Sequence, residues 1–139
     1  IDHFKAYNDH YGHPQGDRCL AQVGHCMKSA VQRPRDLVAR YGGEEFAVIL
    51  PGVHKEGVQV VAERIRDAIE NMALPHATSP VADHVTLSFG LAWCEPVQGE
   101  RPDLLVEAAD EALYAAKGAG RNRLSETVDL ASIRHLMPN

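Results

Sequence analysis

Two adjacent carboxylates that follow a pair of glycines are the residues of this sequence best suited to chemistry. Glu44 and Glu45 come directly after Gly42 and Gly43, and an apolar run lies on each side. Two consecutive glycines are typical of a hairpin turn, because both can take φ > 0 without a Cβ clash. If the glutamates begin the second strand they point to opposite sides. One can then face a metal and the other a substrate, since oxygen ligands beside a glycine turn suit Mg²⁺ and a nucleoside triphosphate. The alternative is a pair of solvated carboxylates on an ordinary hairpin.

Three more polar motifs accompany this stretch in a fixed order. They are Ile1-Asp2-His3-Phe4-Lys5 with Asn8-Asp9, Tyr11-Gly12-His13 and Gly16-Asp17, then Arg33-Pro34-Arg35-Asp36, and last Lys117 with Gly120-Arg121-Asn122. Taken with the Gly-Gly-Glu-Glu-Phe stretch, these motifs resemble those of the GGDEF family, the diguanylate cyclases, in its GGEEF form. Members of that family condense two GTP into cyclic di-GMP. The resemblance runs from Ile1 to about Asn122.

The resemblance implies a metal-dependent nucleotidyl transfer, in which the 3′-hydroxyl of one GTP attacks the α-phosphate of another. It implies Mg²⁺ (or Mn²⁺) bound by Glu45 and by the backbone carbonyl of Ile1. Glu44 is then the neighbouring carboxylate that supports the metal or the attacking hydroxyl. Such metal ions lower the charge barrier and activate the hydroxyl. The alternative for Ile1 is a core strand residue, and both roles are compatible.

The resemblance also implies the substrate contacts. Asn8 and Asp17 match the residues that read guanine, whose N1 and N2 donors suit a carboxylate, while an amide both donates and accepts. From position alone, a turn residue and a helix N-cap are the alternatives. The remaining contacts are at the phosphates: the side chains of Lys5, Lys117 and Arg121, and the backbone of His3, Phe4, Gly42 and Gly43. The alternatives are cations near a helix C-terminus and, for Phe4, a core side chain.

A second site is implied by Arg33 and Asp36, which match the family's inhibitory RxxD motif, and by Arg64, where the family often supplies another arginine. An arginine fork can grip phosphate and guanine acceptors and can stack on bases. We expect cyclic di-GMP to bind there and to inhibit through a product-bridged dimer that holds the active halves apart. The alternative is a surface salt bridge in a turn.

Composition limits the classes of function. The 139 residues suffice for one domain with a core, and the net charge of −5 argues against a nucleic-acid binder that uses bulk electrostatics. The three cysteines lack metal-type spacing and are interpreted as buried thiols in a reducing compartment. Because no apolar run is long enough to span a bilayer, we expect a cytoplasmic location, with a parent protein that can be membrane-anchored.

Periodicity predicts the elements that must position these residues. They are a helix over 16–31, hairpin strands over 37–39 and 46–50, a helix over 54–72, a loop over 74–83, a strand over 84–93, a helix over 103–117 capped by Asp103, a strand over 123–125, and a helical turn around 133–137. This order predicts the α+β class. With one more strand at the start it approaches a βαββαβ core, and the resemblance identifies that core as ferredoxin-like or palm-like.

The sequence opens inside a motif. In the family an Asp that ligates metal precedes Ile1, with a strand and a helix before it. We therefore expect residues 1–126 to be a GGDEF domain without its first strand and helix, and 127–139 to be a tail. Exposed strand edges are expected to destabilise such a fragment or to recruit a strand from another molecule, and its catalysis is expected to be poor.

Three functions remain open at this stage. The first is a cyclase that is active as a homodimer, one GTP per domain, under an upstream sensory or dimerising segment. The second is a catalytically silent cyclic di-GMP receptor that uses the RxxD site. The third is a nucleotidyl cyclase of another base. Intact Glu44, Glu45 and Lys117 favour an enzyme, and Asn8 with Asp17 favours guanine.

Overall fold

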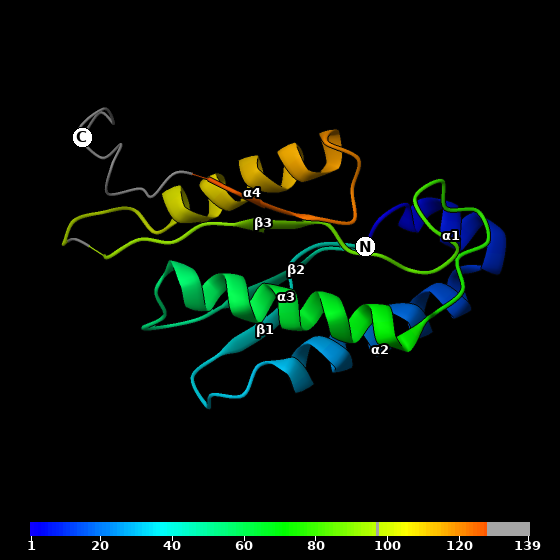
Figure 1. The fold of residues 1–139 in the computed structure, drawn as a ribbon, viewed down its shortest axis with the longest axis horizontal. Helices are drawn as coiled ribbons and strands as arrows, with labels where there is room; N and C mark the ends of the chain where they lie inside the picture. The colour runs from blue at the N-terminus through cyan, green and yellow to red at the C-terminus, as the bar shows by residue number, and fades with distance from the viewer. Residues whose placement is uncertain (97, 128–139) are drawn as a thin grey trace. The chain divides into compact units, whose positions relative to one another are not determined.

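The structure is a computed structural model that describes residues 1–96 and 98–127. It divides into two units, Ile1–Leu87 and a second that begins at Ser88. The elements in chain order are α1 (Phe4–Tyr11), α2 (His13–Ala30), β1 (Leu37–Arg40), β2 (Phe46–Ile49), α3 (Lys55–Met72), β3 (Phe89–Leu91), α4 (Asp103–Gly118) and β4 (Leu124–Glu126) (Figure 1). The helical turn predicted around 133–137 lies outside the described residues, and the predicted domain bounds stay a prediction.

The first unit opens with two consecutive helices. Gly12 separates α1 from α2 with φ 87° and ψ 157°, a conformation that favours glycine, and Pro14 then lies in the first turn of α2. The helix predicted over 16–31 is confirmed but begins earlier, at His13. Helix α1 was not predicted, because its eight residues mix aromatic and polar side chains without a clear apolar stripe. It is held by tertiary contacts, and Phe4 and Tyr7 are its buried residues.

The predicted hairpin is confirmed, but its turn is not the expected one. Strands β1 and β2 pair antiparallel, with Arg40 opposite Phe46. The loop between them is closed where the backbone N–H groups of Tyr41 and Gly42 donate to the carbonyl of Glu45, at 2.8 and 3.2 Å. The expectation of positive φ at both glycines is wrong, because neither lies in the left-handed region. The glutamates also precede β2 rather than begin it.

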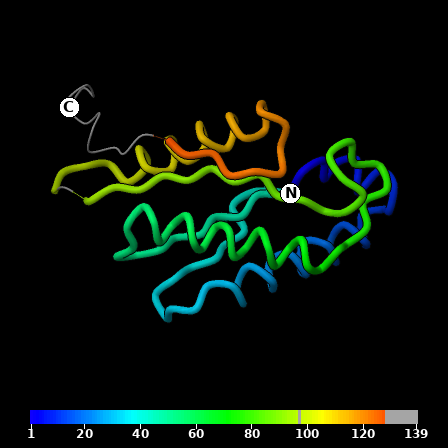
Figure 2. The backbone as a smooth tube through the Cα atoms, viewed as in Figure 1, coloured from blue at the N-terminus to red at the C-terminus, as the bar shows by residue number. Residues whose placement is uncertain are grey.

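Helix α3 buries Ala62, Ile65 and Ile69, and the chain then folds back across α1. We call residues 73–87 the return segment, and Figure 2 shows it beside α1. The strand predicted over 84–93 is wrong in extent, since only β3 and a single bridge between Pro75 and His84 form. Val85, Thr86 and Leu87 are all buried, so the alternating polarity of this stretch does not correspond to alternating exposure.

The second unit is a helix on a pair of parallel strands. Strand β3 pairs with β4, Phe89 opposite Leu124, and α4 packs on both strands. A Cβ at Gly90 would overlap the backbone of α4 at Ala109 and Leu113, so this glycine permits the close helix–strand approach. Asp103 is not the predicted cap: Pro102 occupies that position, and the Asp103 carboxylate pairs with Arg101.

Helices and strands therefore mix as the α+β class requires, with one antiparallel and one parallel two-stranded sheet in the described residues. Within residues 1–96 and 98–127, none of the helices combines the length and the apolar character needed to cross a membrane.

Candidate functional site

The loop between β1 and β2 is held by an arginine that sequence reasoning did not assign a role. The Nε of Arg40 donates to the carbonyls of Gly42 and Gly43, both at 3.2 Å, and its Nη2 donates to Gly43 at 2.8 Å. Because the planar guanidinium group of Arg40 holds two successive carbonyls, it restrains the glycine backbone. A Cβ at Gly43 would meet nothing within 4 Å, so this backbone stays open to a ligand. The signal for Arg40 was its place directly before the loop.

The structure brings Ile1 to the backbone of this loop. The backbone nitrogen of Ile1 donates to the carbonyl of Glu44 at 3.2 Å. Glu44 is exposed and Glu45 is half-buried. Three of the predicted site residues thus lie together in the first unit, although they are far apart in the sequence.

The donors at this loop fit a hard cation. They are carboxylate and carbonyl oxygens, the ligands that Mg²⁺ prefers, and Mg²⁺ usually keeps several waters and substrate phosphates in its shell. No group of three or more His, Cys, Asp and Glu residues in the described part of the chain is placed to hold a metal. A metal site of the zinc type, with three or more such ligands, is therefore absent from those residues. A cation held by the carboxylates of Glu44 and Glu45 and the carbonyl of Ile1 would keep coordination positions open for phosphate oxygens.

The two predicted guanine readers meet where α1 crosses α2. A Cβ at Gly16 would overlap the Oδ1 of Asn8 and would lie 2.9 Å from its Cγ, so the Asn8 amide rests on the bare backbone next to Asp17. The Oδ1 of Asn8 is buried and lacks a hydrogen-bond partner within the described residues. The turn and N-cap alternatives are wrong, because Asn8 lies inside α1 and Asp17 inside α2.

The N-terminus of α1 carries the first predicted phosphate contacts. His3 is the N-cap, with φ 52° and ψ 41° in the left-handed region, and helix N-termini present backbone N–H groups to anions. The Phe4 side chain is buried, as the core alternative predicted, and Lys5 is exposed.

The other phosphate cations belong to the second unit. Lys117 lies in the last turn of α4 and is half-buried. Arg121 follows with φ 65°, and its backbone N–H donates to Ala116 at 3.0 Å. Their contact with a triphosphate stays a prediction.

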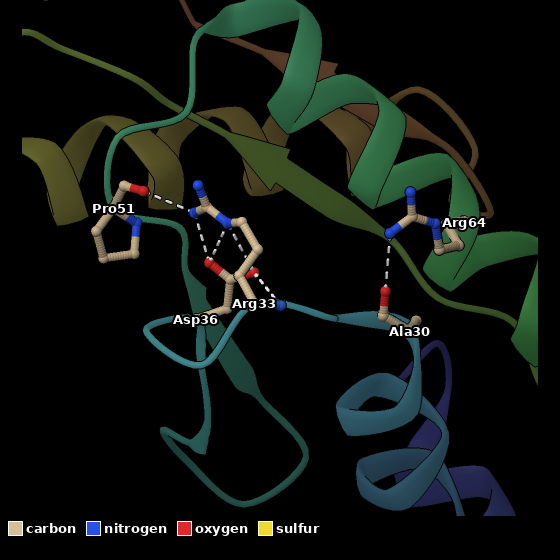
Figure 3. Close-up of polar contacts among 5 residues, drawn as sticks. All are labelled: Ala30, Arg33, Asp36, Pro51 and Arg64. Carbon is tan, nitrogen blue, oxygen red and sulfur yellow. Dashed lines mark hydrogen bonds and ion pairs between the residues drawn. The ribbon is translucent and has the colours of Figure 1, made fainter.

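The RxxD motif forms a closed ion pair (Figure 3). The Nη2 of Arg33 lies 2.6 Å from the Oδ1 of Asp36 and also donates to the Pro51 carbonyl at 2.6 Å. The Arg33 hydrogen bonds lower the pKa of Asp36, whose side chain is only 3% exposed. Arg64, on α3, donates instead to the carbonyl of Ala30 at 3.1 Å. The salt bridge expected as the alternative is present, and it leaves 45% of the Arg33 side chain exposed to a ligand.

Comparison with known proteins now extends this geometry. Residues 1–123 match the family profile described as "Diguanylate cyclase, GGDEF domain". The probable diguanylate cyclase DgcT of Escherichia coli (strain K12) is 39% identical over 124 residues, which are 89% of this chain and 27% of that protein. Diguanylate cyclase A of Treponema denticola is 41% identical over 125 residues, which are 90% of this chain and 33% of that protein. The chain thus spans about a quarter to a third of these relatives.

Solved structures agree on the fold. The GGDEF domain of DgcB from Caulobacter crescentus, crystallised in complex with c-di-GMP, matches with a TM-score of 0.74 at 36% identity. The match covers 91% of this chain and 72% of that one. The predicted fold, related to that of nucleotidyl cyclases, is confirmed.

Proposed function

This chain belongs to the GGDEF domain family of diguanylate cyclases, and from this premise we propose that it is a catalytic domain that condenses two GTP into cyclic di-GMP. The observation that carries the proposal is the backbone hydrogen bond between Ile1 and Glu44, which places the two residues side by side at an open, arginine-restrained glycine loop. An oxygen-donor site of this kind suits a triphosphate and its cation. The residues that would read the base, Asn8 and Asp17, support the same substrate.

The reaction forms two phosphodiester bonds and releases two pyrophosphates. Each 3′-hydroxyl oxygen attacks the α-phosphorus of the other GTP, and the bond from that phosphorus to the bridging oxygen of pyrophosphate breaks. Bound Mg²⁺ (or Mn²⁺) would supply charge neutralisation at the phosphates and a lower pKa for the hydroxyl. Glu45 and the Ile1 carbonyl would hold the ion, and Glu44 would accept the hydroxyl proton or support the ion.

The other predicted site residues would position the substrate. Asp17 would accept from guanine N1 and N2, and the Asn8 amide would complete the base contact. The backbone of His3, Phe4, Gly42 and Gly43 and the side chains of Lys5, Lys117 and Arg121 would hold the phosphates. Fixed geometry of this kind replaces an unfavourable encounter of two substrates with a bound pair. Because each domain would bind one GTP, the active form would be a homodimer, brought together by a sensory or dimerising segment of the parent protein.

Product feedback is the second part of the proposal. Cyclic di-GMP would bind at Arg33 and Asp36 with help from Arg64. A catalytically silent cyclic di-GMP receptor is the second candidate function, and the exposed Arg33 side chain of the RxxD ion pair is the observation that favours it. The carboxylates of the glycine loop favour the enzyme, since a receptor has no physical need for them. Poor catalysis by these 139 residues alone stays a prediction.

The test is product identification. The protein is incubated with GTP and Mg²⁺, and nucleotides are resolved by mass spectrometry, with ATP as the control substrate. We expect cyclic di-GMP and pyrophosphate in a ratio of one to two, and no cyclic product from ATP. Cyclic di-GMP binding without any turnover in a folded dimer would favour the receptor. A cyclic product from ATP would favour a cyclase of another base.

A further inference from the structure

A buried histidine on the return segment contacts the N-terminus of α1. His76 is 1% exposed, and its Nε2 lies 3.1 Å from the backbone carbonyl of His3. A carbonyl only accepts, so Nε2 carries the proton and donates. The Nδ1 of His76 is buried and has no hydrogen-bond partner among the residues that the structure describes. The catalytic scheme above leaves this side chain without a role.

The residue that His76 contacts has an unusual backbone. His3 lies in the left-handed region, which is uncommon for a residue with a Cβ and indicates a local constraint. Its carbonyl accepts twice: from His76, and from the backbone N–H of Tyr7 at 3.1 Å, the first hydrogen bond of α1. Both lone pairs of that oxygen are therefore used at the point where the helix begins.

Other contacts hold the return segment on α1 beside this bond. The hydroxyl of Thr78 donates to the carbonyl of Ala6 at 3.3 Å, and the hydroxyl of Tyr11 accepts from the backbone N–H of Ala77 at 3.0 Å. The ring of His76 meets that of Tyr7 edge-on, with centroids 5.2 Å apart. These contacts fix the His76 ring, so its N–H is aimed at His3 by the fold.

We propose that His76 is a positioning residue for the triphosphate: its Nε2–H holds His3 in the left-handed conformation from which the backbone N–H groups of His3 and Phe4 reach the substrate phosphates. The inference rests on the proposed function, because those amides are its phosphate contacts. His76 itself touches no substrate. It acts through the His3 carbonyl, which belongs to the same peptide group as the Phe4 N–H.

A purely structural role for His76 would have different consequences. Loss of packing would lower the folded fraction and would weaken every ligand alike. Loss of positioning would weaken only ligands that carry a triphosphate, and would leave guanosine, which lacks phosphates, bound as before. The two roles are thus separated by a ratio of affinities and not by an affinity alone.

Three variants make the comparison. His76→Leu removes the donor and keeps most of the volume. His76→Gln keeps an N–H near the position of Nε2, whereas His76→Asn places its amide closer to the main chain, near the position of Nδ1. The matched control is His84→Gln, because His84 lies on the same segment but pairs with Asp83 and Glu70 rather than with α1.

Binding of GTP with Mg²⁺ and of guanosine is measured by amide NMR titration for each protein. We expect His76→Leu and His76→Asn to weaken GTP binding by about 2- to 10-fold, the range of one hydrogen bond, with guanosine binding unchanged. His76→Gln should restore GTP binding, and His84→Gln should match the wild type. Equal weakening of both ligands, or unchanged GTP binding in His76→Leu, would overturn the proposal. If His76→Leu does not fold, the Gln and Asn pair decides.

A nucleotide-free readout separates this inference from the proposed function. If the wild type binds no GTP, the proposed function fails, and the backbone of His3 still reports on His76. The φ of His3 is followed by its amide–Hα coupling and carbon shifts. We expect His76→Leu to leave the left-handed region and His76→Gln to stay in it. A left-handed His3 in His76→Leu would overturn the role of His76 regardless of the nucleotide.

Discussion

Gly16 tests whether the contact between α1 and α2 builds a guanine site. A Cβ at this position would overlap the Oδ1 of Asn8 and would lie 3.4 Å from the Cζ of Phe4, inside the packed junction of the two helices. Gly16→Ala must therefore displace the Asn8 amide. Alanine gains about 1 kcal/mol of helix propensity, while overpacking costs about 1–3 kcal/mol. The free energy of unfolding should fall by roughly 0–2 kcal/mol, so the variant stays folded.

The effect on binding should exceed what stability explains. A displaced amide loses about one hydrogen bond to the base, about 0.5–1.5 kcal/mol, which corresponds to about 2- to 10-fold weaker binding. Because the lost contact is to guanine, GTP and guanosine should weaken by the same factor in an NMR titration. The His76 variants should instead weaken GTP alone. The two sets of substitutions thus separate base recognition from phosphate recognition.

A matched control is available on α3. A Cβ at Gly57 would lie 2.5 Å from the Cγ1 of Val53, the end of a side chain that can turn away. Gly57→Ala should leave both affinities unchanged. Folded Gly16→Ala protein that binds guanosine and GTP as tightly as the wild type would refute the assignment of Asn8 as a base reader.

Three further predictions follow from the same site and surface. Glu45→Gln, which keeps the shape and removes the charge, should lower cyclic di-GMP formation at least about 100-fold while GTP still binds; near-normal turnover would remove Glu45 from the metal site. Arg33→Ala should abolish cyclic di-GMP binding and feedback inhibition in a calorimetric titration, and equal binding by the variant would exclude the RxxD site. The hydrogen bond that His84 donates to Asp83 and the ion pair with Glu70 raise the pKa of His84. That raised pKa stabilises the fold below the unfolded value of about 6.5, and the gain is lost as pH rises through the raised value. Urea unfolding of the wild type should therefore lose stability relative to His84→Gln as pH rises through neutrality, and parallel pH profiles would contradict the pairing.

Sequence patterns predicted which local elements form better than the backbone conformation within them. The glycine loop, the RxxD turn and the helix over 54–72 follow from local residue types, and the structure contains all three. The conformation of the loop was not predicted. Two kinds of hydrogen bond determine it without a positive φ: those from Arg40 to the carbonyls of Gly42 and Gly43, and those that close the loop at the Glu45 carbonyl. A hydrogen bond from a side chain to the backbone leaves no periodic pattern in the sequence, so it cannot be predicted from one.

The elements that depend on tertiary partners were the ones that sequence patterns missed. Helix α1 is short, and its stability comes from aromatic packing and from the return segment. Residues 84–88 alternate like a strand, yet their backbone bonds go elsewhere: Val85 donates to Leu74, and Thr86 accepts from Asp2. Thr86 is buried together with Val85 and Leu87, so an alternation of polar and apolar residues does not by itself establish a half-buried strand. The role proposed for His76 was likewise not visible, because its partner lies far away in the sequence.

The most direct test of the central claim is the rate of cyclic di-GMP formation as a function of protein concentration. It is measured with GTP and Mg²⁺ on this protein, beside the Glu45→Gln variant. For a dimer-dependent cyclase we expect a rate that rises more steeply than linearly with protein concentration and that disappears in the variant. No cyclic di-GMP from a folded, dimeric protein that binds GTP would contradict it, and the RxxD surface would then become the centre of the function.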